Sequence, residues 1–375
     1  MTGAESVVIG AGIWGCTIAR RLAESGRHVR VLEKRLDVGG NVRCEIDPDT
    51  GIEIHLYGSH IFHTHDAEAW AFIRRFTDFN GYQHKVLAEY RGKTYHLPLG
   101  LTLVNKFFGV ELKPAEVEEF LSDPARKAQL FDAFFRGYTS KQWGKAPEEI
   151  DPEVIKRVPV RNNYDINYFN DCWQGIPSDG YNAMFKRMLS HQNISVETGR
   201  DVTLAGVRQW VRDGIRVFYS GPLDRLFEYK YGALPWRSLR FECETLPIAD
   251  FQGTAVVNYT EAEVPYTRIH EFRHYHPEGR LTSVSGGSAW GWDQGKTVIM
   301  REYPKSWKMG DEPYYPIVNS ASAELLAKYQ AEVTDLNDQF AVSTPLPQLV
   351  VGGRLGQYKY YDMDQAVAAA MAVGS

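Results

Sequence analysis

Three glycines near the N-terminus have the spacing of a dinucleotide-binding turn. Gly10, Gly12 and Gly15 follow the apolar residues 7–9 and open a stretch, residues 16–25, in which apolar residues recur with helical spacing. In such a strand–turn–helix unit the first glycine makes the tight turn, the second admits a pyrophosphate, and the third lets the helix pack on the strand. The helix N-terminus adds free N–H groups and partial positive charge. We therefore predict a site for a nucleotide cofactor.

A carboxylate and a second glycine pair extend this site. The next apolar run ends in Glu33, where a carboxylate would bind a ribose hydroxyl. The glycine fingerprint alone does not separate NAD from FAD, and a structural α/β unit without a ligand is the alternative. The basic pair Lys34 and Arg35 and the later pair Gly39-Gly40 favour FAD, because a second glycine pair lets another backbone segment approach the cofactor.

Arginines embedded among aromatic residues indicate a second anionic ligand. They are Arg157, Arg161, Arg237 and Arg268. A guanidinium in apolar surroundings is costly unless it meets an anion, and its planar fork matches a phosphate. We predict a phosphate-bearing ligand distinct from the cofactor. The alternative is a set of arginine–carboxylate pairs that join a helical region to a sheet. The sequence shows no nucleophile elbow, HExxH, CxxC or P-loop lysine.

Composition narrows the class of protein. A chain of 375 residues is too long for one compact core, so two or three subdomains are expected. A net charge of −5 argues against a nucleic-acid surface. Four scattered cysteines, no signal-peptide pattern and no long apolar run predict a cytoplasmic protein with reduced thiols and no membrane span. His60 and His63 lie in a glycine-containing loop without metal-ligand spacing, so we predict a loop over the cofactor and no metal.

Hydrophobic periodicity predicts alternating helices and strands. Helices are expected at residues 67–76, within 101–143 with Pro114 opening one of them, and at 181–189, 321–336 and the C-terminal end. Strands are expected at 42–47, 52–56, 194–197, 202–204, 215–219, 239–246, 253–259 and 297–303, with a hairpin at 84–97. Residues 57–64 are expected to form a loop, 145–159 a mobile lid, and 279–295 an exposed loop.

Longer stretches resemble a known family, the bacterial UDP-galactopyranose mutases, especially the mycobacterial type. The resemblance covers nearly the whole chain. Its motifs are HxYGxHIFHT at 55–64, GYTxKQW at 137–143, IKRxPVR at 155–161, FQGTAVxN at 251–258, VPYTRIH at 264–270, DEPYYP at 311–316, and the stretch 352–362. GYTxKQW and the tyrosine-rich tail before Asp362 are specific to this family and are not general flavoprotein signatures.

The resemblance implies an α/β fold in three parts. A Rossmann-like FAD-binding domain would comprise residues 1–80, 183–225 and 320–375. An inserted helical domain with the lid would span 98–182, and an antiparallel β-sheet domain would comprise 81–97 and 226–319. Residues 108–131 form a shorter helical segment than in the mycobacterial pattern. Asp364 stands where the family usually has histidine, which is expected to place a carboxylate close to the flavin.

The implied reaction is the isomerisation of UDP-galactopyranose to UDP-galactofuranose without net redox change. FAD would be active when reduced, and its N5 would attack the anomeric carbon. The implied partners are a UDP-sugar, an electron donor such as NADPH or reduced flavin, and a second copy of the chain in a homodimer, with the product used in galactofuranose-containing cell-surface glycans. The alternatives are a mutase for UDP-GalNAc or a dTDP-6-deoxyhexose, an amine-oxidase-like FAD oxidoreductase, and a non-catalytic flavoprotein.

The resemblance also assigns residues. The catalytic residues would be Arg157, Arg268 and His63. The substrate-binding residues would be His84, Phe135, Tyr138, Thr139, Trp143, Arg157, Tyr168, Arg237, Asn258, Arg268, Glu302, Tyr315 and Tyr360. The cofactor-binding residues would be Gly10, Gly12, Ile13, Gly15, Glu33, Lys34, Arg35, Gly40, Asn41, Ser59, His60, Ile61, His63, Val202, Gly221, Gly353, Arg354, Tyr361, Asp362 and Met363.

Overall fold

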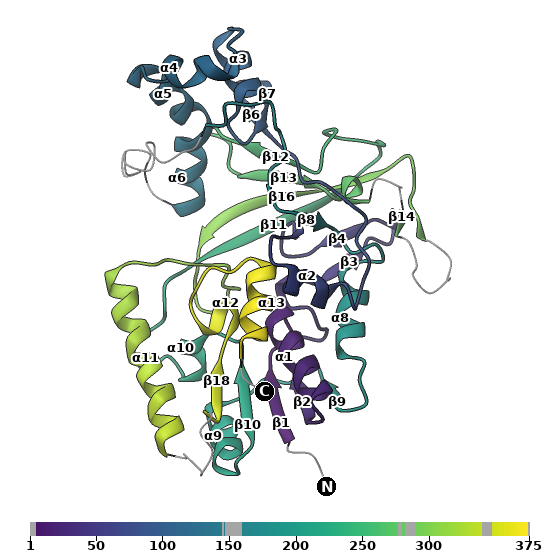
Figure 1. The fold of residues 1–375 in the computed structure, drawn as a ribbon, viewed down its shortest axis with the longest axis vertical. Coiled ribbons are helices and arrows are strands. Elements are labelled where there is room, and N and C mark those ends of the chain that lie inside the picture. Colours follow the sequence, from purple (N-terminus) through teal and green to yellow (C-terminus); the bar gives the residue numbers. More distant parts are fainter. Residues whose placement is uncertain are drawn as a thin grey trace.

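A five-stranded parallel sheet forms the lower half of the molecule in Figure 1. The structure is a computed structural model that describes residues 5–144, 146, 160–276, 280–281, 290–339 and 347–373. The strand order is β18-β10-β1-β2-β9. The bounds are β1 (Glu5–Ile9), β2 (His28–Leu32), β9 (Ile194–Glu197), β10 (Arg216–Tyr219) and β18 (Leu349–Val351). All neighbours in this sheet run parallel.

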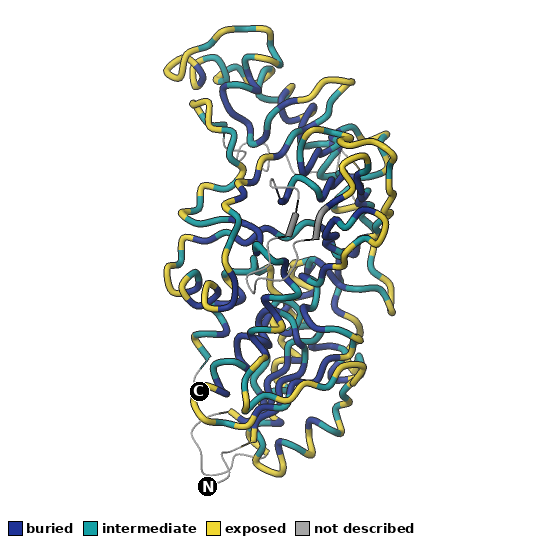
Figure 2. The backbone as a smooth tube through the Cα atoms, turned by 90° about the vertical axis from the view of Figure 1, so that its right-hand side faces the viewer, coloured by how far each residue is buried: buried dark blue, intermediate teal, exposed yellow. Residues whose placement is uncertain are grey.

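Helices cover both faces of this sheet, which explains its continuous apolar strands. Val8 and Phe218 pack with one layer, and Val7 and Val217 pack with the other. The first layer contains α1 (Ile13–Glu24), α8 (Tyr181–Leu189) and α13 (Met363–Met371). The second contains α9 (Leu204–Arg212), α10 (Leu223–Leu226) and α11 (Ser320–Gln339). The buried backbone in the lower half of Figure 2 follows these strands.

A seven-stranded sheet lies above the first. Its order is β17-β11-β16-β13-β12-β6-β7. The bounds are β6 (Val86–Tyr90), β7 (Lys93–Leu97), β11 (Trp236–Leu246), β12 (Val256–Tyr259), β13 (Arg268–Glu271), β16 (Thr297–Ser306) and β17 (Tyr315–Pro316). The sheet is antiparallel except for the pair β12–β6, which runs parallel. A tight hairpin cannot join a parallel pair, and β6 and β12 belong to chain segments far apart in the sequence.

A helical segment projects beyond β6 and β7 at the top of Figure 1. It contains α3 (Leu101–Phe108), the 3₁₀ turn η2 (Pro114–Glu116), α4 (Val117–Phe120), α5 (Pro124–Phe131), the π-helical turn η3 (Asp132–Arg136) and α6 (Gly137–Trp143). Pro114 opens the 3₁₀ turn, as predicted, because a helix start does not need its missing N–H. Parallel sheet, helical segment and second sheet together confirm the predicted fold class.

Shorter elements connect these parts. They are η1 (Gly40–Val42), β3 (Cys44–Ile46), β4 (Glu53–His55), β5 (Phe62–Thr64), α2 (Ala67–Ile73), β8 (Trp173–Gly175), η5 (Phe272–Tyr275), β14 (Arg280–Leu281), β15 (Trp290–Gly291) and α12 (Gly353–Gly356). β3 pairs with β4, and β5 with β8. Among the described residues, no helix is long and apolar enough to span a membrane.

Three sequence-based expectations were wrong. Residues 202–204 do not form a strand; Thr203 accepts a hydrogen bond from the N–H of Gly206 at 3.3 Å and caps helix α9. Residues 57–64 are not wholly a loop, because β5 pairs with the distant β8. In the segment 279–295, Trp292 is buried rather than exposed and packs edge-on against His276. The expected lid, residues 145–159, lies outside the described residues apart from Ala146.

Candidate active site

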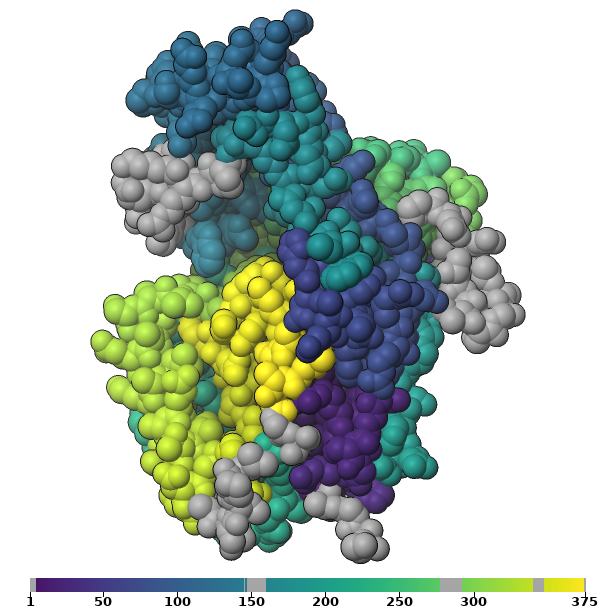
Figure 3. Space-filling model, viewed as in Figure 1, coloured from purple at the N-terminus to yellow at the C-terminus, as the bar shows by residue number. Residues whose placement is uncertain are grey.

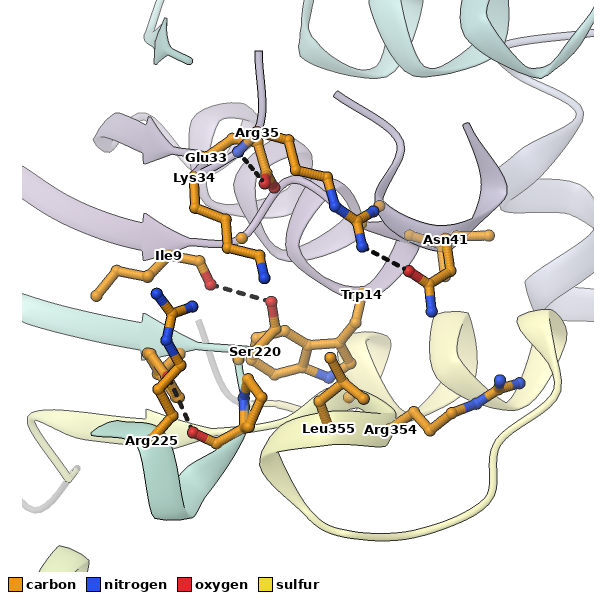
Figure 4. A pocket seen from close by; sticks show the side chains of 18 of the residues that line it. Ile9, Trp14, Glu33, Lys34, Arg35, Asn41, Ser220, Arg225, Arg354 and Leu355 are labelled. Atoms are coloured by element: carbon orange, nitrogen blue, oxygen red, sulfur yellow. Dashed lines mark hydrogen bonds between the residues drawn. The ribbon is translucent and has the colours of Figure 1, made fainter. Parts of the chain in front are cut away.

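A cavity of about 350 Å³ lies at the carboxyl ends of β1, β2 and β10. Ligands of open parallel sheets bind at this edge. Figure 4 shows side chains next to the glycine-containing turns 10–15 and 39–40, such as Trp14 and Asn41, gathered around this cavity. The cavity is lined by these residues predicted to bind the cofactor: Gly10, Gly12, Ile13, Glu33, Lys34, Arg35, Gly40, Asn41, His60, Val202, Gly221, Gly353, Arg354, Tyr361, Asp362 and Met363.

Backbone approach explains the glycines in this cavity. Gly10 has φ +98°, a conformation that side chains rarely adopt. A Cβ on Gly40 would lie 2.9 Å from the Cα of Gly12, so the two turns touch through their backbones. Gly15 does not line the cavity; a Cβ there would lie 2.0 Å from the carbonyl oxygen of Gly10. Its place matches the helix-packing role of the third glycine.

The buried carboxylate of Glu33 organises the same turns. Its Oε2 accepts a hydrogen bond from the N–H of Ala11 at 2.7 Å, and its Oε1 accepts one from the N–H of Arg35 at 2.9 Å. Each carboxylate oxygen has a further lone pair for a ligand hydroxyl. Arg35 donates to Asn41 Oδ1 at 2.8 Å, and its guanidinium lies over the ring of Tyr57. The free acceptor sites of Glu33 and the guanidinium of Arg35 fit a dinucleotide ligand.

A second, larger cavity of about 970 Å³ opens beside the first. The two share Asn41, His60, Arg354, Asp362 and Met363. Figure 3 shows the molecule hollowed between the helical segment and the C-terminal elements. The second cavity is also lined by these predicted site residues: Ser59, Ile61, His63, His84, Phe135, Tyr138, Trp143, Tyr168, Asn258, Arg268, Glu302, Tyr315 and Tyr360. A ligand in one cavity therefore meets a ligand in the other at the shared residues.

Arg268 is the centre of a charged network in the second cavity. It donates to the hydroxyl of Tyr138, and its Nε lies 3.5 Å from Glu302 Oε1. Burial of Glu302 opposes ionisation, but the charge of Arg268 and the hydrogen bond from His270 hold its pKa at about 2. The Arg268 side chain is 27% exposed and lines the second cavity. The carboxylate thus stabilises a guanidinium whose exposed part can meet an anion.

The histidines around this network are held neutral. Burial and the positive charge of Arg354 lower the pKa of His60 to about 4, and its Nδ1 lies 2.6 Å from the carbonyl oxygen of Gly58. Burial and the charge of Arg268 lower the pKa of His84 to about 3. Near neutral pH these rings are polar and uncharged.

The comparisons with known proteins agree with this geometry. A family model described as UDP-galactopyranose mutase matches residues 133–360, and one for NAD(P)-binding Rossmann-like domains matches residues 8–76. A probable UDP-galactopyranose mutase of Klebsiella pneumoniae is 36% identical over 99% of this chain and 94% of its own length. A dTDP-fucopyranose mutase of Escherichia coli is 34% identical over 97% of this chain and 96% of its own length.

The chain belongs to the UDP-galactopyranose mutase family.

The fold comparison is consistent with this family. A crystal structure of reduced UDP-galactopyranose mutase superposes with a TM-score of 0.68 at 15% identity, over 99% of this chain and 93% of that one. The predicted family and enzyme class, a mutase, are confirmed, and the family implies a flavin cofactor. The touching turns at Gly12 and Gly40 and the buried carboxylate of Glu33 fit such a cofactor.

Two residues predicted to bind the substrate of this mutase do not line either cavity. Thr139 is on α6 but outside the lining. Arg237 is buried and donates from Nε to the carbonyl of Gln142 at 2.7 Å and from Nη2 to that of Lys141 at 3.2 Å. Its guanidinium therefore binds the C-terminal carbonyls of α6, where positive charge is favourable.

The two remaining arginines of the predicted set are Arg161, which contacts other protein groups, and Arg157. Arg161 donates to the carbonyl of Asn167 at 2.7 Å and lies 3.5 Å from Asp165, so it joins parts of the protein. Arg157 lies outside the described residues. The partners of Arg161 and Arg237 in the structure are protein groups, so these two do not support the prediction that all four arginines face an anion. The alternative of arginine–carboxylate pairs has an example in Arg161 with Asp165, whereas Arg237 binds backbone carbonyls.

Ser59 and Asp364 are placed differently from the sequence-based expectation. The hydroxyl of Ser59 accepts a hydrogen bond from Tyr275 and lies 2.5 Å from His270 Nδ1, so it extends the Arg268 network. Asp364 lines neither cavity; it accepts a hydrogen bond from Thr64 Oγ1 at 2.8 Å. This carboxylate therefore joins α13 to β5.

Sequence reasoning missed several lining residues. The first cavity also contains Trp14, Ser220, Arg225 and Glu312. The second also contains Phe134, Gln142, Phe169 and Tyr314. A signal was present for two of them, because Phe134, Tyr138 and Gln142 recur at intervals of four, the spacing of one helix face.

In the described part of the chain, two clusters outside the cavities have spacing that could hold a metal ion. They are Cys44, Glu53 and His55, and Asp250, Glu271 and His274. In the first, His55 Nδ1 accepts a hydrogen bond from the N–H of His60 at 3.0 Å. The neutral ring therefore carries its proton on Nε2, which lies 4.0 Å from Glu53 Oε2. His55 acts here as a hydrogen-bonding group.

Proposed function

We propose that this protein interconverts UDP-galactopyranose and UDP-galactofuranose with a bound, reduced FAD. The observation that carries the proposal is the second cavity, which is lined by the partly exposed Arg268 and shares five lining residues with the cofactor cavity. When bound, the reduced flavin supplies a nucleophile, its N5 atom, for the anomeric carbon of the sugar. NADPH or a reduced flavin is the proposed source of electrons.

In this proposal the protein's own residues bind and orient the substrate and neutralise the charge of its diphosphate. Arg268 stabilises negative charge on the diphosphate as its bond to the sugar breaks, with Arg157 as its partner. Glu302 keeps the guanidinium charged and oriented, since its own pKa is held at about 2. His60 and His84 add no charge near neutral pH. Positive charge is therefore concentrated where the leaving group needs it.

Aromatic residues form the proposed nucleotide and diphosphate subsites. Tyr315 and Tyr360 stack with ring centroids 6.0 Å apart, and the guanidinium of Arg354 lies over Tyr360. Their hydroxyls donate to the diphosphate in this proposal. Phe135, Tyr138 and Tyr168 hold the uridine, and Trp143 lies near the sugar. A flat base stacks favourably on such rings without a charged partner.

A second candidate substrate is a dTDP-linked 6-deoxyhexose. The full-length relative named dTDP-fucopyranose mutase favours it, because that relative is nearly as similar as the first. The same cofactor and diphosphate residues would serve both sugars. The two candidates differ at the base, at the 2′-hydroxyl of the ribose and at the sugar C6.

The test incubates dithionite-reduced protein separately with UDP-galactofuranose and dTDP-fucofuranose and separates the products chromatographically. We expect pyranose from the UDP sugar, activity only with reduced protein, and no net flavin oxidation. Turnover of the dTDP sugar alone would replace the substrate assignment. Flavin reoxidation coupled to stoichiometric reduction of the substrate would instead indicate an oxidoreductase.

A further inference from the structure

A histidine–carboxylate pair lies at the wall of the second cavity. His63 Nδ1 and Asp171 Oδ2 are 2.9 Å apart, and both side chains are largely buried, with 16% and 18% exposed. The His63 ring stacks on Phe169 with centroids 3.7 Å apart and an angle of 13° between the planes. The stacking and the hydrogen bond together fix the ring in its plane. No hydrogen bond to its second nitrogen, Nε2, is found among the residues that the structure describes.

Two strands that are distant in the sequence build this pair. His63 lies in the middle of β5, opposite Gln174 of β8, and Asp171 lies two residues before the start of β8. Asp171 Oδ1 also lies 3.6 Å from Nε2 of His65, whose side chain is 62% exposed. That separation is too long for a hydrogen bond. The carboxylate therefore has one close imidazole partner, the one that lines the cavity.

Ring contraction needs a group that can accept and return a proton. In the pyranose the ring bond joins C1 to O5, and in the furanose it joins C1 to O4. When C1–O5 breaks, its electron pair goes to O5, which gains a proton. When C1–O4 forms, an electron pair of O4 makes the bond and O4 loses a proton. One proton is taken up and one is released, so the balance is zero.

We propose that Asp171 is a positioning residue that keeps a proton of His63 on Nδ1, so that Nε2 presents its lone pair to the substrate. His63 Nε2 then accepts the O4 proton and returns a proton to O5. This inference rests on the proposed function. A carboxylate that accepts from one imidazole nitrogen fixes the tautomer and makes the other nitrogen more basic. Phe169 holds the ring so that this lone pair keeps one direction.

The direct test is the tautomer of His63. Histidine labelled with ¹⁵N reports by NMR which ring nitrogen carries the proton, and His63→Gln identifies the resonance by its loss. We expect the Nδ1–H form in the wild type. Asp171→Asn should convert it to the Nε2–H form, because the new amide donates to Nδ1. An Nε2–H form in the wild type, or an unchanged pattern in the variant, overturns the proposal.

Kinetics separate a positioning role from a structural one. Asp171→Asn should lower kcat more than tenfold, with the dissociation constant for UDP within twofold of the wild type, and Asp171→Glu should recover part of the loss. The double variant with His63→Gln should be no slower than the slower single variant, because the two residues act as a unit. A kcat within twofold of wild type in Asp171→Asn contradicts the proposal.

A matched control is His65→Gln, which changes the exposed imidazole next to the same carboxylate. It should leave the His63 tautomer and kcat unchanged. If the wild type binds UDP but converts neither sugar nucleotide, the proposed function fails and the catalytic part of this proposal fails with it. The tautomer measurement does not depend on turnover, so the positioning of His63 by Asp171 is decided separately.

Discussion

At the scale of single residues, Arg268 makes the sharpest prediction. Its guanidinium pairs with Glu302 through Nε and donates to Tyr138 through Nη2, and its side chain, 27% exposed, lines the second cavity. Loss of a preorganised donor to developing charge costs about 2.7–4 kcal/mol. Arg268→Ala should therefore lower kcat/KM about 10²- to 10³-fold, and Arg268→Lys should recover little, since an ammonium lacks the planar fork. The control is Arg240→Ala, a half-exposed arginine paired with Glu242. Equal losses in both alanine variants would contradict the assignment.

His84 predicts a pH dependence of stability. Its pKa falls from 6.5 to about 3 on folding, so the unfolded chain binds more protons between these values. The stability that depends on this neutral ring is complete above pH 6.5 and is lost as the pH falls toward 3. When the pH is lowered from 7 to 5, the free energy of unfolding of the wild type should fall by about 2 kcal/mol more than that of His84→Gln, because glutamine cannot take up the proton.

Urea unfolding at the two pH values measures this difference. The control is His28→Gln, because His28 is exposed at the edge of β2. This substitution should change the pH dependence by much less. The same loss in wild type and His84→Gln would show that other groups cause the acid sensitivity.

At the scale of elements, Gly15 tests how α1 is held on β1. A Cβ at this position would lie 2.0 Å from the carbonyl oxygen of Gly10. Gly15→Ala must push helix α1 away from the carbonyl of Gly10, together with the helix N–H groups that bind a pyrophosphate. This displacement should lower the free energy of unfolding by about 1–3 kcal/mol. We expect lower stability and less bound flavin, measured by the ratio of flavin to protein absorbance.

Gly206 provides the matched glycine. It lies inside α9, and the nearest atom to an added methyl group, Thr203 Oγ1, would be 3.7 Å away. Gly206→Ala should stabilise the protein by about 0.5–1 kcal/mol, because alanine is the better helix former, and should leave flavin binding unchanged. Loss of flavin from both variants would mean that the close approach at Gly15 is not the cause.

The elements also show what the sequence could and could not predict. The βαβ unit, the hairpin at β6 and β7, and helix α8 follow from local periodicity, and all were predicted. The pairing of β5 with β8 was not, because two strands of three residues, more than a hundred positions apart, leave no periodic signal. At 202–204, two apolar residues suggested a strand, but the cap at Thr203 begins a helix.

The same limit applies to the site. Most lining residues belong to motifs that could be read directly, from Gly10 to Asp362. Arg237 was misplaced because its residue type suits a phosphate and a helix end equally well, and only the tertiary structure places it at α6. Asp171 was missed because its partner, His63, comes from a different strand.

At the scale of the whole molecule, the two cavities form one continuous site. His60 and Arg354 line both, so a cofactor in the first cavity fixes side chains that a UDP-sugar needs in the second. Binding at one cavity should therefore strengthen binding at the other. Coupling between sites is typically about 1–3 kcal/mol, or about 5- to 150-fold. We expect UDP to bind the flavin-loaded protein more tightly than the flavin-free protein by a factor in this range.

Thermodynamic linkage adds a second requirement, because UDP must raise the affinity of the protein for flavin by the same factor. Calorimetry measures both directions on one preparation. Arg354→Met should reduce the factor, because Arg354 lines both cavities. Arg225→Met, at a residue that lines the first cavity and not the second, should weaken flavin binding without changing the factor. Equal UDP affinities with and without flavin would mean that the cavities are adjacent but energetically independent, and Arg354 would then serve the cofactor alone.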